Sequence, residues 1–353
     1  MTRTASDAAL RLGTRGSALA LAQSQMVADA VARALGRPVE LVRVRTEGDR
    51  LTGSLAALGG TGVFVAALRE ALADGRCDLA VHSLKDLPTA DAPGLLVAAV
   101  PERADPRDAL CARDGLTLQA LPAGARVGTG SPRRAAQLRV LRPDLAVVDI
   151  RGNVDTRLGR VPGLASAAGG SATAVPVGAT PAAAGPIAAA DLDAVVLAAA
   201  GLGRLGRSAA ASELLDPSAV MPAPGQGALA VECRAADTAL VAGLAALDHT
   251  PSRLAVTAER ALLAALEAGC AAPVGALGTL RPDGVLLLDA VVCRPDGGAR
   301  LVRSAALPVA GLGHDAVATA AALGTRLAAD LLAAGAAELA PLGPQRPNAR
   351  DHA

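Results

Sequence analysis

Basic residues recur in this sequence beside turn signals, where a folded chain can present charged side chains to a ligand. Together with one carboxylate, they fall at predicted ends of strands and starts of helices: Arg15, Lys85, Asp86, Arg133, Arg134, Arg151 and Arg204. A guanidinium binds a carboxylate through two parallel hydrogen bonds, so several in one crevice suit a ligand with several carboxylates. Each could instead be a solvated charge or a local ion pair, and their grouping is what favours a binding site.

One predicted helix start supports this interpretation. Ser131 is a predicted N-cap and Pro132 a predicted first helical residue, so Arg133 and Arg134 lie in the first turn. Backbone N–H groups at a helix start already favour anions. Ser17 is a second predicted N-cap, ahead of a long apolar-periodic run.

His82 ends a predicted buried strand at 79–82, and Asp86 follows shortly after it in the segment 82–88. The carboxylate of Asp86 stands beside Lys85, so it could form an ion pair, cap a helix or act in catalysis. We expect His82 to be a buried, hydrogen-bonded histidine and not a base.

The five cysteines are widely spaced and form no C-x-x-C pair, so they predict neither a disulfide framework nor a zinc site. Cys270 differs from the others because Gly269 and Pro273 place it on a loop, where a thiol is presented and not packed. The remaining cysteines are expected to be small buried hydrophobes: Cys77, Cys111, Cys233 and Cys293.

The segment 201–206 matches the dinucleotide fingerprint G-x-G-x-x-G. That fingerprint also needs a helix, a second strand and an acidic residue roughly 20 positions further on. Here the chain runs quickly into Asp216, Pro217 and Pro222, which leaves no room for such a unit. A nicotinamide site is therefore not expected.

Predicted strands alternate with predicted helices along most of the chain. The strands are expected at 39–46, 79–82, 145–150 and 194–200, and the helices at 18–35, 63–73 and from residue 132. This alternation predicts an α/β architecture with largely parallel sheets. Ligands of such sheets bind beyond the carboxyl ends of the strands, where the charged residues fall.

Length and composition limit the classes of function. With 353 residues the chain is expected to form two or three domains. The net charge is +1 and Phe64 is the only aromatic residue, so nucleic acid is not an expected partner. Residues 1–7 lack the pattern of a secretory signal, and no run reaches the roughly 20 apolar residues of a membrane span. A cytoplasmic protein with no membrane partner is predicted.

Segments over nearly the whole chain resemble, in order, the porphobilinogen deaminase family. The more specific are HSLKDLP at 82–88, SPRR at 131–134 and the late cysteine loop, and others include PERADPRDA at 101–109 and PAPGQGALAVECR at 222–234. The resemblance implies three α/β domains. The first two would resemble a two-lobed type II solute-binding protein, and the third would be a small α/β domain that carries the cofactor cysteine.

The resemblance implies a transferase of tetrapyrrole (haem) biosynthesis that joins four porphobilinogen molecules head to tail, with loss of ammonia, into hydroxymethylbilane. It also implies a dipyrromethane primer bound by thioether to Cys270. Asp86 matches the catalytic aspartate, whose charge would stabilise the electron-poor azafulvenium left by ammonia. Cofactor-holding positions match Ser83, Lys85, Thr129, Ser131, Arg133 and Arg134. Substrate-binding positions match Arg15, Ser17, Phe64, Arg151, Arg157 and Arg204.

The family pattern predicts domains at 1–103 (with a return segment at about 226–246), 104–222 and 247–345. A monomer without a metal is expected, with porphobilinogen as its small-molecule partner. Thr61 stands where the family commonly has Lys, which puts a contact from that loop in doubt, and Ala268 replaces the first Gly of Gly-Gly-Cys. Residues 163–190 carry no charge and resemble a low-complexity insertion outside the cores, with no assigned role.

The main rival is a non-enzymatic two-lobed binding module for an anionic solute. Such a module would account for the arginines but not for Cys270, and the lack of a secretion signal counts against it.

Overall fold

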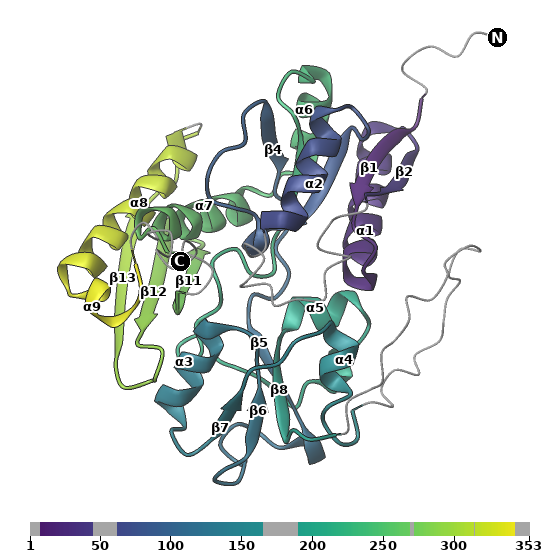
Figure 1. The fold of residues 1–353 in the computed structure, drawn as a ribbon. Helices are drawn as coiled ribbons and strands as arrows, with labels where there is room; N and C mark the ends of the chain where they lie inside the picture. Colours follow the sequence, from purple (N-terminus) through teal and green to yellow (C-terminus); the bar gives the residue numbers. More distant parts are fainter. Residues whose placement is uncertain (1–7, 45–61, 165–189, 269–271, 314, 343–353) are drawn as a thin grey trace, which may run out of the picture.

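The computed structural model describes residues 8–44, 62–164, 190–268, 272–313 and 315–342, which form two lobes and a third unit (Figure 1). Each part is built on one sheet. The strand order is β2-β1-β3-β10-β4 in the first lobe, β7-β6-β8-β5-β9 in the second lobe and β11-β12-β13 in the third unit. The predicted α/β architecture is confirmed.

The first lobe has helices on both faces of its sheet. Its strands are β1 (Leu10–Thr14), β2 (Val39–Arg43), β3 (Leu79–Ser83), β4 (Leu95–Ala99) and β10 (Leu229–Arg234). Its helices are α1 (Ala18–Leu35), α2 (Gly62–Ala73) and α6 (Thr238–Leu244). Alternate residues of a strand face opposite sides, so Leu79 packs with the α1 side and Ala80 with the α2 side. Helix α1 begins at the predicted N-cap, where Ser17 Oγ accepts a hydrogen bond from Ala20 N at 3.3 Å.

The second lobe is built in the same way. Its strands are β5 (Asp108–Ala112), β6 (Arg126–Gly128), β7 (Ala146–Val148), β8 (Ala194–Ala198) and β9 (Glu213–Leu214). Leu138 of α3 (Pro132–Leu141) packs on one face, and Leu158 of α4 (Val154–Leu158) and Leu202 of α5 (Ala199–Arg204) pack on the other. The predicted helix start is confirmed, because Ser131 Oγ accepts from Arg134 N at 3.5 Å and Pro132 follows.

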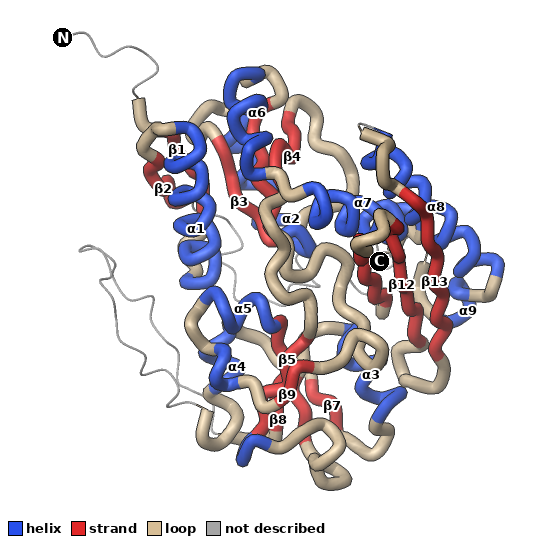
Figure 2. Tube along the Cα trace, turned by 180° about the vertical axis from the view of Figure 1, so that it is seen from behind, coloured by secondary structure: helices blue, strands red, loops and turns tan. Residues whose placement is uncertain are grey.

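The two lobes repeat one strand order, and the chain crosses between them twice. In each lobe the first of three parallel strands (β1 or β6) lies between the other two, and an antiparallel strand (β10 or β5) comes next in the sheet. These opposed strands, β5 and β10, are the ones that the chain enters after crossing at residues 100–107 and 215–228. We call these two crossings the hinge segments. They lie side by side, since Ala104 N donates to Gly227 O at 3.3 Å, and Figure 2 shows them as loops between the lobes.

The third unit packs two long helices on an antiparallel sheet. Its strands are β11 (Val274–Leu280), β12 (Val285–Cys293) and β13 (Arg300–Pro308), and its helices are α7 (Thr250–Ala265), α8 (Asp315–Ala333) and α9 (Ala336–Leu339). Helix α8 is long and apolar enough to cross a membrane by those criteria alone. Its residues Leu323, Leu327 and Leu331 are buried in the core with Leu262 of α7 and Leu288 of β12, as expected for a core helix.

The prediction of largely parallel sheets is wrong. β1 runs parallel to β2 and β3, and β6 runs parallel to β7 and β8. β5 and β10 run antiparallel to their neighbours, because each enters its lobe from the other one. The third sheet is antiparallel because short connections at 281–284 and 294–299 reverse the chain.

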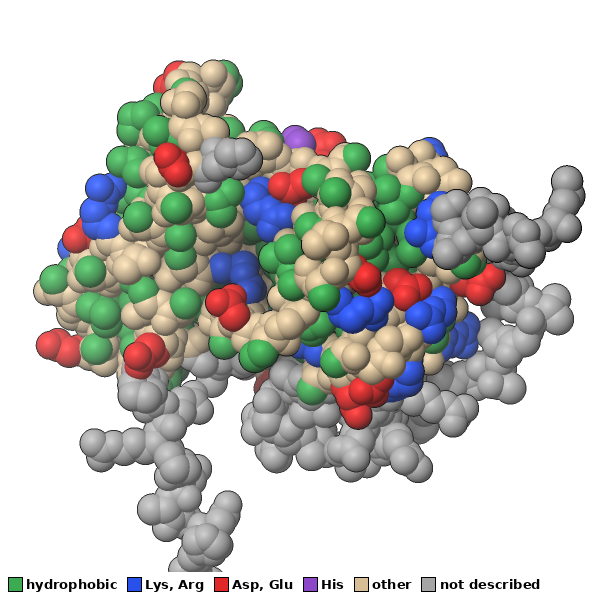
Figure 3. Space-filling view, turned by 90° about the horizontal axis from the view of Figure 1, so that it is seen from above, with side chains coloured by type: hydrophobic (Ala, Val, Ile, Leu, Met, Phe, Trp, Pro, Cys, Tyr) green, Lys and Arg blue, Asp and Glu red, His purple; other side chains and the backbone are tan. Residues whose placement is uncertain are grey.

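Short 3-10 helices and a mixed surface complete the description. The 3-10 helices are η3 (Leu84–Asp86), η4 (Arg113–Gly115), η6 (Ser208–Ala210) and η7 (Ala245–Leu247). On the face shown in Figure 3, basic and acidic side chains are interspersed, in line with the net charge of +1.

Candidate active site

The predicted site residues of both lobes follow the carboxyl ends of strands. Arg15 and Ser17 come after β1, and Ser83 ends β3 just before η3, which contains Lys85 and Asp86. In the second lobe, Thr129 and Ser131 follow β6, and Arg151 and Arg157 follow β7. In both sheets the charged residues therefore lie at the edge formed by the carboxyl ends of the parallel strands, as the sequence predicted.

Asp108 is the centre of this site. It is completely buried at the start of β5 and accepts hydrogen bonds from Arg133 Nη2 at 2.8 Å and from Arg134 Nη2 at 2.7 Å. Burial opposes its ionisation, but the two cations outweigh burial and hold the pKa of Asp108 well below its ordinary value. The Nη1 groups of the pair reach backbone carbonyls. Arg133 Nη1 donates to Met221 O, and Arg134 Nη1 donates to Val196 O at 3.1 Å.

Gln226 links this centre to the first lobe. Its Nε2 donates to Asp108 Oδ1 at 2.7 Å and to Pro106 O at 2.8 Å. Its Oε1 accepts from Lys85 Nζ at 3.5 Å and from Arg134 Nη2 at 3.4 Å. An amide can do this because it carries a donor and an acceptor, whereas a carboxylate would face Asp108 with a second negative charge.

Glycine is required beside Gln226. At Gly227 the backbone has φ +87°, and a Cβ would lie 2.5 Å from Ala104 O in the other hinge segment. Only glycine adopts this conformation and leaves room for that contact. The close approach of the hinge segments therefore fixes where the Gln226 amide lies.

Lys85 adds a cation that changes its charge near neutral pH. Loss of solvent around its ammonium lowers the pKa of Lys85 to about 8, with Arg134 and Arg133 acting in the same direction and Asp86 and Asp108 opposing them. Its side chain is nevertheless exposed. The water that still reaches it limits the effect.

Arg157 and Arg151 extend the positive charge towards α4. Burial, followed by the cations of Arg134 and Arg151, lowers the pKa of Arg157. Its buried Nε has no hydrogen-bond partner in the described part of the chain. Arg151 is half exposed and donates to Asp149 Oδ2 at 3.1 Å. The structure thus brings Lys85 and four arginines of the second lobe into one group.

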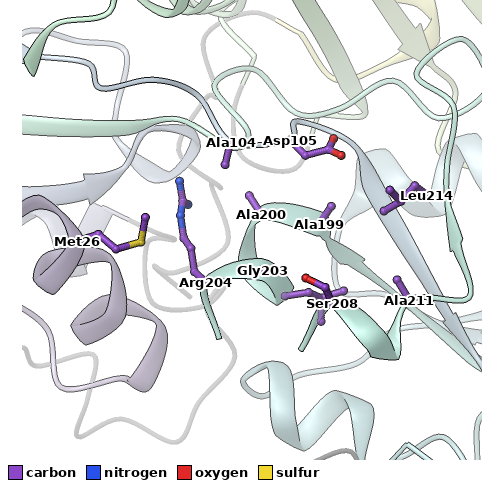
Figure 4. Close-up of a pocket in the computed structure, with 11 residues that line it drawn as sticks. Met26, Ala104, Asp105, Ala199, Ala200, Gly203, Arg204, Ser208, Ala211 and Leu214 are labelled. Atoms are coloured by element: carbon purple, nitrogen blue, oxygen red, sulfur yellow. The ribbon is translucent and has the colours of Figure 1, made fainter. Parts of the chain in front are cut away.

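Arg204 lies apart from this group, at the hinge. Its Nη2 donates to Gly227 O at 2.7 Å, and burial lowers its pKa. It lines a cavity of about 590 Å³ between α1, α5 and a hinge segment. Figure 4 shows its side chain between Met26 and Ala104.

The other predicted residues are placed as follows. Asp86 is half-buried, and its carboxylate interacts electrostatically with the neighbouring Lys85. Thr129 is buried, and its Oγ1 accepts from Ser131 N at 3.2 Å. Phe64 lies in α2, but its side chain is not described. Thr61, Cys270 and most of the insertion (165–189) lie outside the described residues.

Two expectations of burial are confirmed. His82 is buried, and its Nε2 lies 3.1 Å from Glu232 Oε2 at ion-pair distance, in a geometry that does not make the expected hydrogen bond. The cysteines outside the loop are all buried, and burial raises the pKa of their thiols, to about 12 for Cys111 and about 11 for Cys233 and Cys293. Thiols with such pKa values are poor nucleophiles at neutral pH.

Sequence reasoning missed Asp108 and Gln226. The available signals were an acidic residue opening an otherwise apolar run, DALCA, and a glutamine between two glycines, GQG. Neither signal names a partner. The role of each residue depends on contacts across more than 20 positions of sequence, such as Asp108 with Arg133 and Gln226.

The donor set fits a dipyrromethane with several carboxylates. Cations outnumber carboxylates in the group around Asp108, and the buried Nε atoms of Arg133 and Arg157 have no partner among the described residues. A buried donor without a partner is costly, so a ligand acceptor would relieve it. Fold and site together define a two-lobed α/β protein with a group of cations, beyond the ends of its strands, that suits a polycarboxylate.

Comparison with known proteins identifies the family. The family model described as "Porphobilinogen deaminase, dipyromethane cofactor binding domain" matches residues 10–242, and "Porphobilinogen deaminase, C-terminal domain" matches 253–333. The chain is 57% identical over 339 residues to "Porphobilinogen deaminase" of Leifsonia xyli, covering 95% of both chains. It is 54% identical over 344 residues to that of Cutibacterium acnes, covering 95% of this chain and 97% of the relative.

Similarity to solved structures is weak. The match to YhfZ from Shigella flexneri has a TM-score of 0.31 at 18% identity and covers 71% of this chain and 87% of the other. No conclusion rests on such a score.

The chain therefore belongs to the porphobilinogen deaminase family. It is a transferase of tetrapyrrole biosynthesis that uses a dipyrromethane cofactor to join porphobilinogen into hydroxymethylbilane, as the resemblance implied. The rival interpretation, a non-enzymatic solute binder, finds no support.

Proposed function

We propose that the group around Asp108 holds the cofactor and that Cys270 attaches it. The residues that would contact the cofactor are Ser83, Lys85, Thr129, Ser131, Arg133 and Arg134. The observation that carries this proposal is the convergence of Arg133 and Arg134 on the buried carboxylate of Asp108, to which Gln226 joins Lys85, because three cations around one carboxylate leave positive charge for the ligand. When bound, the cofactor supplies the pyrrole end to which substrate is joined.

Asp86 is the catalytic residue of this proposal. Its carboxylate is half-buried in η3, beside the Lys85 ammonium. Loss of ammonia makes the substrate cationic, and a fixed negative charge stabilises a cation better than mobile water does. Asp86 therefore stabilises that charge and accepts or returns pyrrole protons.

Substrate carboxylates would bind the remaining basic side chains. The proposed set is Arg15, Ser17, Phe64, Arg151, Arg157 and Arg204. Arg157 and Arg204 each have a buried Nε without a partner in the described residues. Arg157 has the better support of the two, because Arg204 Nη2 already binds Gly227 O.

The wider organisation is also proposed. The domains would be 1–103 with the return segment at about 226–246, 104–222, and 247–345, in line with the three sheets. The enzyme would act as a cytoplasmic monomer, without nucleic-acid or membrane partners.

Intact mass tests the covalent attachment. The chain has no Trp or Tyr, so the polypeptide itself absorbs almost nothing near 280 nm. Purified protein should be heavier than its sequence by two linked pyrrole units, with the adduct on the peptide containing Cys270. Cys270→Ser should lose both added mass and activity, because an alcohol is scarcely ionised at neutral pH.

Cys111→Ala is the matched control and should keep both the added mass and the turnover. Active wild-type protein at its bare sequence mass would overturn the attachment.

A further inference from the structure

One stripe of helix α7 faces the first lobe. Arg253, Val256 and Arg260 are spaced by three and four residues, so they share a side of the helix. Arg253 donates to Val97 O and Ala98 O of β4, each at 3.2 Å. Figure 1 shows α7 between the first lobe and the third sheet. The helix that leads to the Cys270 loop is therefore fastened to the first lobe by side chains.

Arg260 fastens the segment that carries Lys85 and Asp86. Its Nη1 donates to Leu87 O at 2.8 Å and to Leu84 O at 3.4 Å, and its Nη2 donates to Pro88 O at 2.7 Å. Among the described residues it makes no ion pair, so these carbonyls are its partners. One guanidinium thus binds the backbone on both sides of Asp86.

Apolar contacts seat the same segment on α7. Leu84 and Leu87 are buried in one cluster with Val256, one turn before Arg260. Backbone bonds hold the segment's shape, with Leu84 N donating to Ala228 O at 3.0 Å and Leu87 N donating to Leu84 O at 3.2 Å. Apolar contacts resist separation but do not fix orientation, whereas the planar fork of Arg260 does.

Helix α7 is itself held firmly at this point. The neighbouring Glu259 is completely buried and accepts from Arg103 Nη1 at 2.6 Å, Gly225 N at 2.6 Å and Gly278 N at 2.7 Å. Arg260 therefore projects from a fixed support. A change at Arg260 moves the segment and not the helix.

We propose that Arg260 is a positioning residue, which orients the η3 backbone and with it the Asp86 carboxylate and the Lys85 ammonium. This inference rests on the proposed catalytic role of Asp86. Small displacements of a catalytic group are costly, with a factor of about 100 in rate for roughly 1 Å. Arg260 would therefore act on the chemical step without touching substrate.

The test compares Arg260→Met with Arg253→Met in the holoenzyme, with cofactor content measured by intact mass. Both changes remove a guanidinium of α7 that binds first-lobe carbonyls, and Arg253 also pairs with Asp248 at 2.7 Å, so the control loses at least as many contacts. Melting temperature, kcat and KM for porphobilinogen are measured for each. Arg260→Lys is included because it keeps the charge but not the fork.

For Arg260→Met we expect full cofactor loading, a KM close to wild type and a kcat lower by about 100-fold. Arg260→Lys should recover part of the kcat, and Arg253→Met should lower the melting temperature alone. Equal loss of melting temperature with unchanged kcat in both Met variants would overturn the proposal. If Arg260→Met does not fold, wild-type kcat in Arg260→Lys overturns it instead.

Asp86→Asn separates this inference from the proposed function. Turnover in Asp86→Asn within a few-fold of wild type would remove the catalytic role of Asp86 itself. An inactive Asp86→Asn beside a fully active Arg260→Met would leave that role intact and reject only the positioning by Arg260.

Discussion

Two arginine pairs of the second lobe look alike in sequence and differ in the folded protein. Arg133 and Arg134 are buried and bound to Asp108. Arg133 also donates to Met221 O, and Arg134 donates to Val196 O and to Gln226 Oε1. Arg151 and Arg157 lie further along the same edge, one half exposed and one with a buried Nε that has no partner among the described residues. The first pair has most of its donors engaged inside the protein. The second pair keeps donors for a ligand.

The difference shows that an arginine at a strand end has two possible uses. When a buried carboxylate neutralises it, the guanidinium becomes part of the framework and presents only its remaining edge. When a partly buried guanidinium makes no ion pair, as for Arg157 among the described residues, burial and like charges disfavour the cation, and a ligand carboxylate relieves both. The predictions below separate these uses, starting from the largest effect.

Asp108→Asn should damage the framework pair most. The amide keeps the size of Asp108 but leaves Arg133 and Arg134 buried without a counter-charge, which typically costs about 3–5 kcal/mol. The free energy of unfolding, measured by urea denaturation, should fall by that amount. Asp149→Asn is the control, because the Asp149–Arg151 pair is exposed, and it should change stability by less than about 1 kcal/mol. Similar stability in both variants would contradict the comparison.

Arg157→Leu should affect substrate and not the fold. Loss of one charge-assisted hydrogen bond costs about 1.5–3 kcal/mol, roughly a 10- to 150-fold fall in kcat/KM. Partly extended enzyme–pyrrole complexes should accumulate and be visible by mass. Since the Nε has no partner in the described residues, the melting temperature should hardly change. A large loss of stability at wild-type turnover would move Arg157 into the framework.

Arg151→Leu should have a smaller effect of the same kind. Its side chain is half exposed and already paired with Asp149, so solvent screens whatever charge it meets. We expect a loss of no more than about 1 kcal/mol, roughly five-fold in kcat/KM. A larger loss than in Arg157→Leu would show that exposure in the free protein does not rank these two arginines.

Lys85 should produce the smallest effect, in the pH dependence of stability. Its folded-state pKa of about 8 lies below the ordinary 10.5, so between these values the unfolded chain binds more protons and stability rises with pH. The comparison is made in Cys270→Ser protein, which should carry no cofactor and hence no cofactor carboxylates. Below pH 8, adding Lys85→Met should make this protein more stable than it is with Lys85. The gain in stability should shrink as the pH rises towards 10.5. A pH-independent difference in melting temperature would show that Lys85 is not desolvated.

Local patterns determined much of this protein. The N-caps at Ser17 and Ser131, the buried strand before Asp86 and the placement of basic residues at strand ends all follow from short-range rules. The family resemblance determined the reaction and the cofactor. These features were predictable because each depends on residues close in sequence or on a family motif that stands in the sequence itself.

Tertiary structure decided strand direction and the partners of the charges. β5 and β10 run against their neighbours because the chain crosses the hinge before each, which no local pattern encodes. Asp108 meets Arg134 within the second lobe and Gln226 only where the chain crosses back, and Arg260 meets the carbonyls around Asp86 across about 170 positions of sequence. Residue type tells which charges a chain carries. Which of them neutralise one another, and which remain for a ligand, depends on distances that only the folded chain sets.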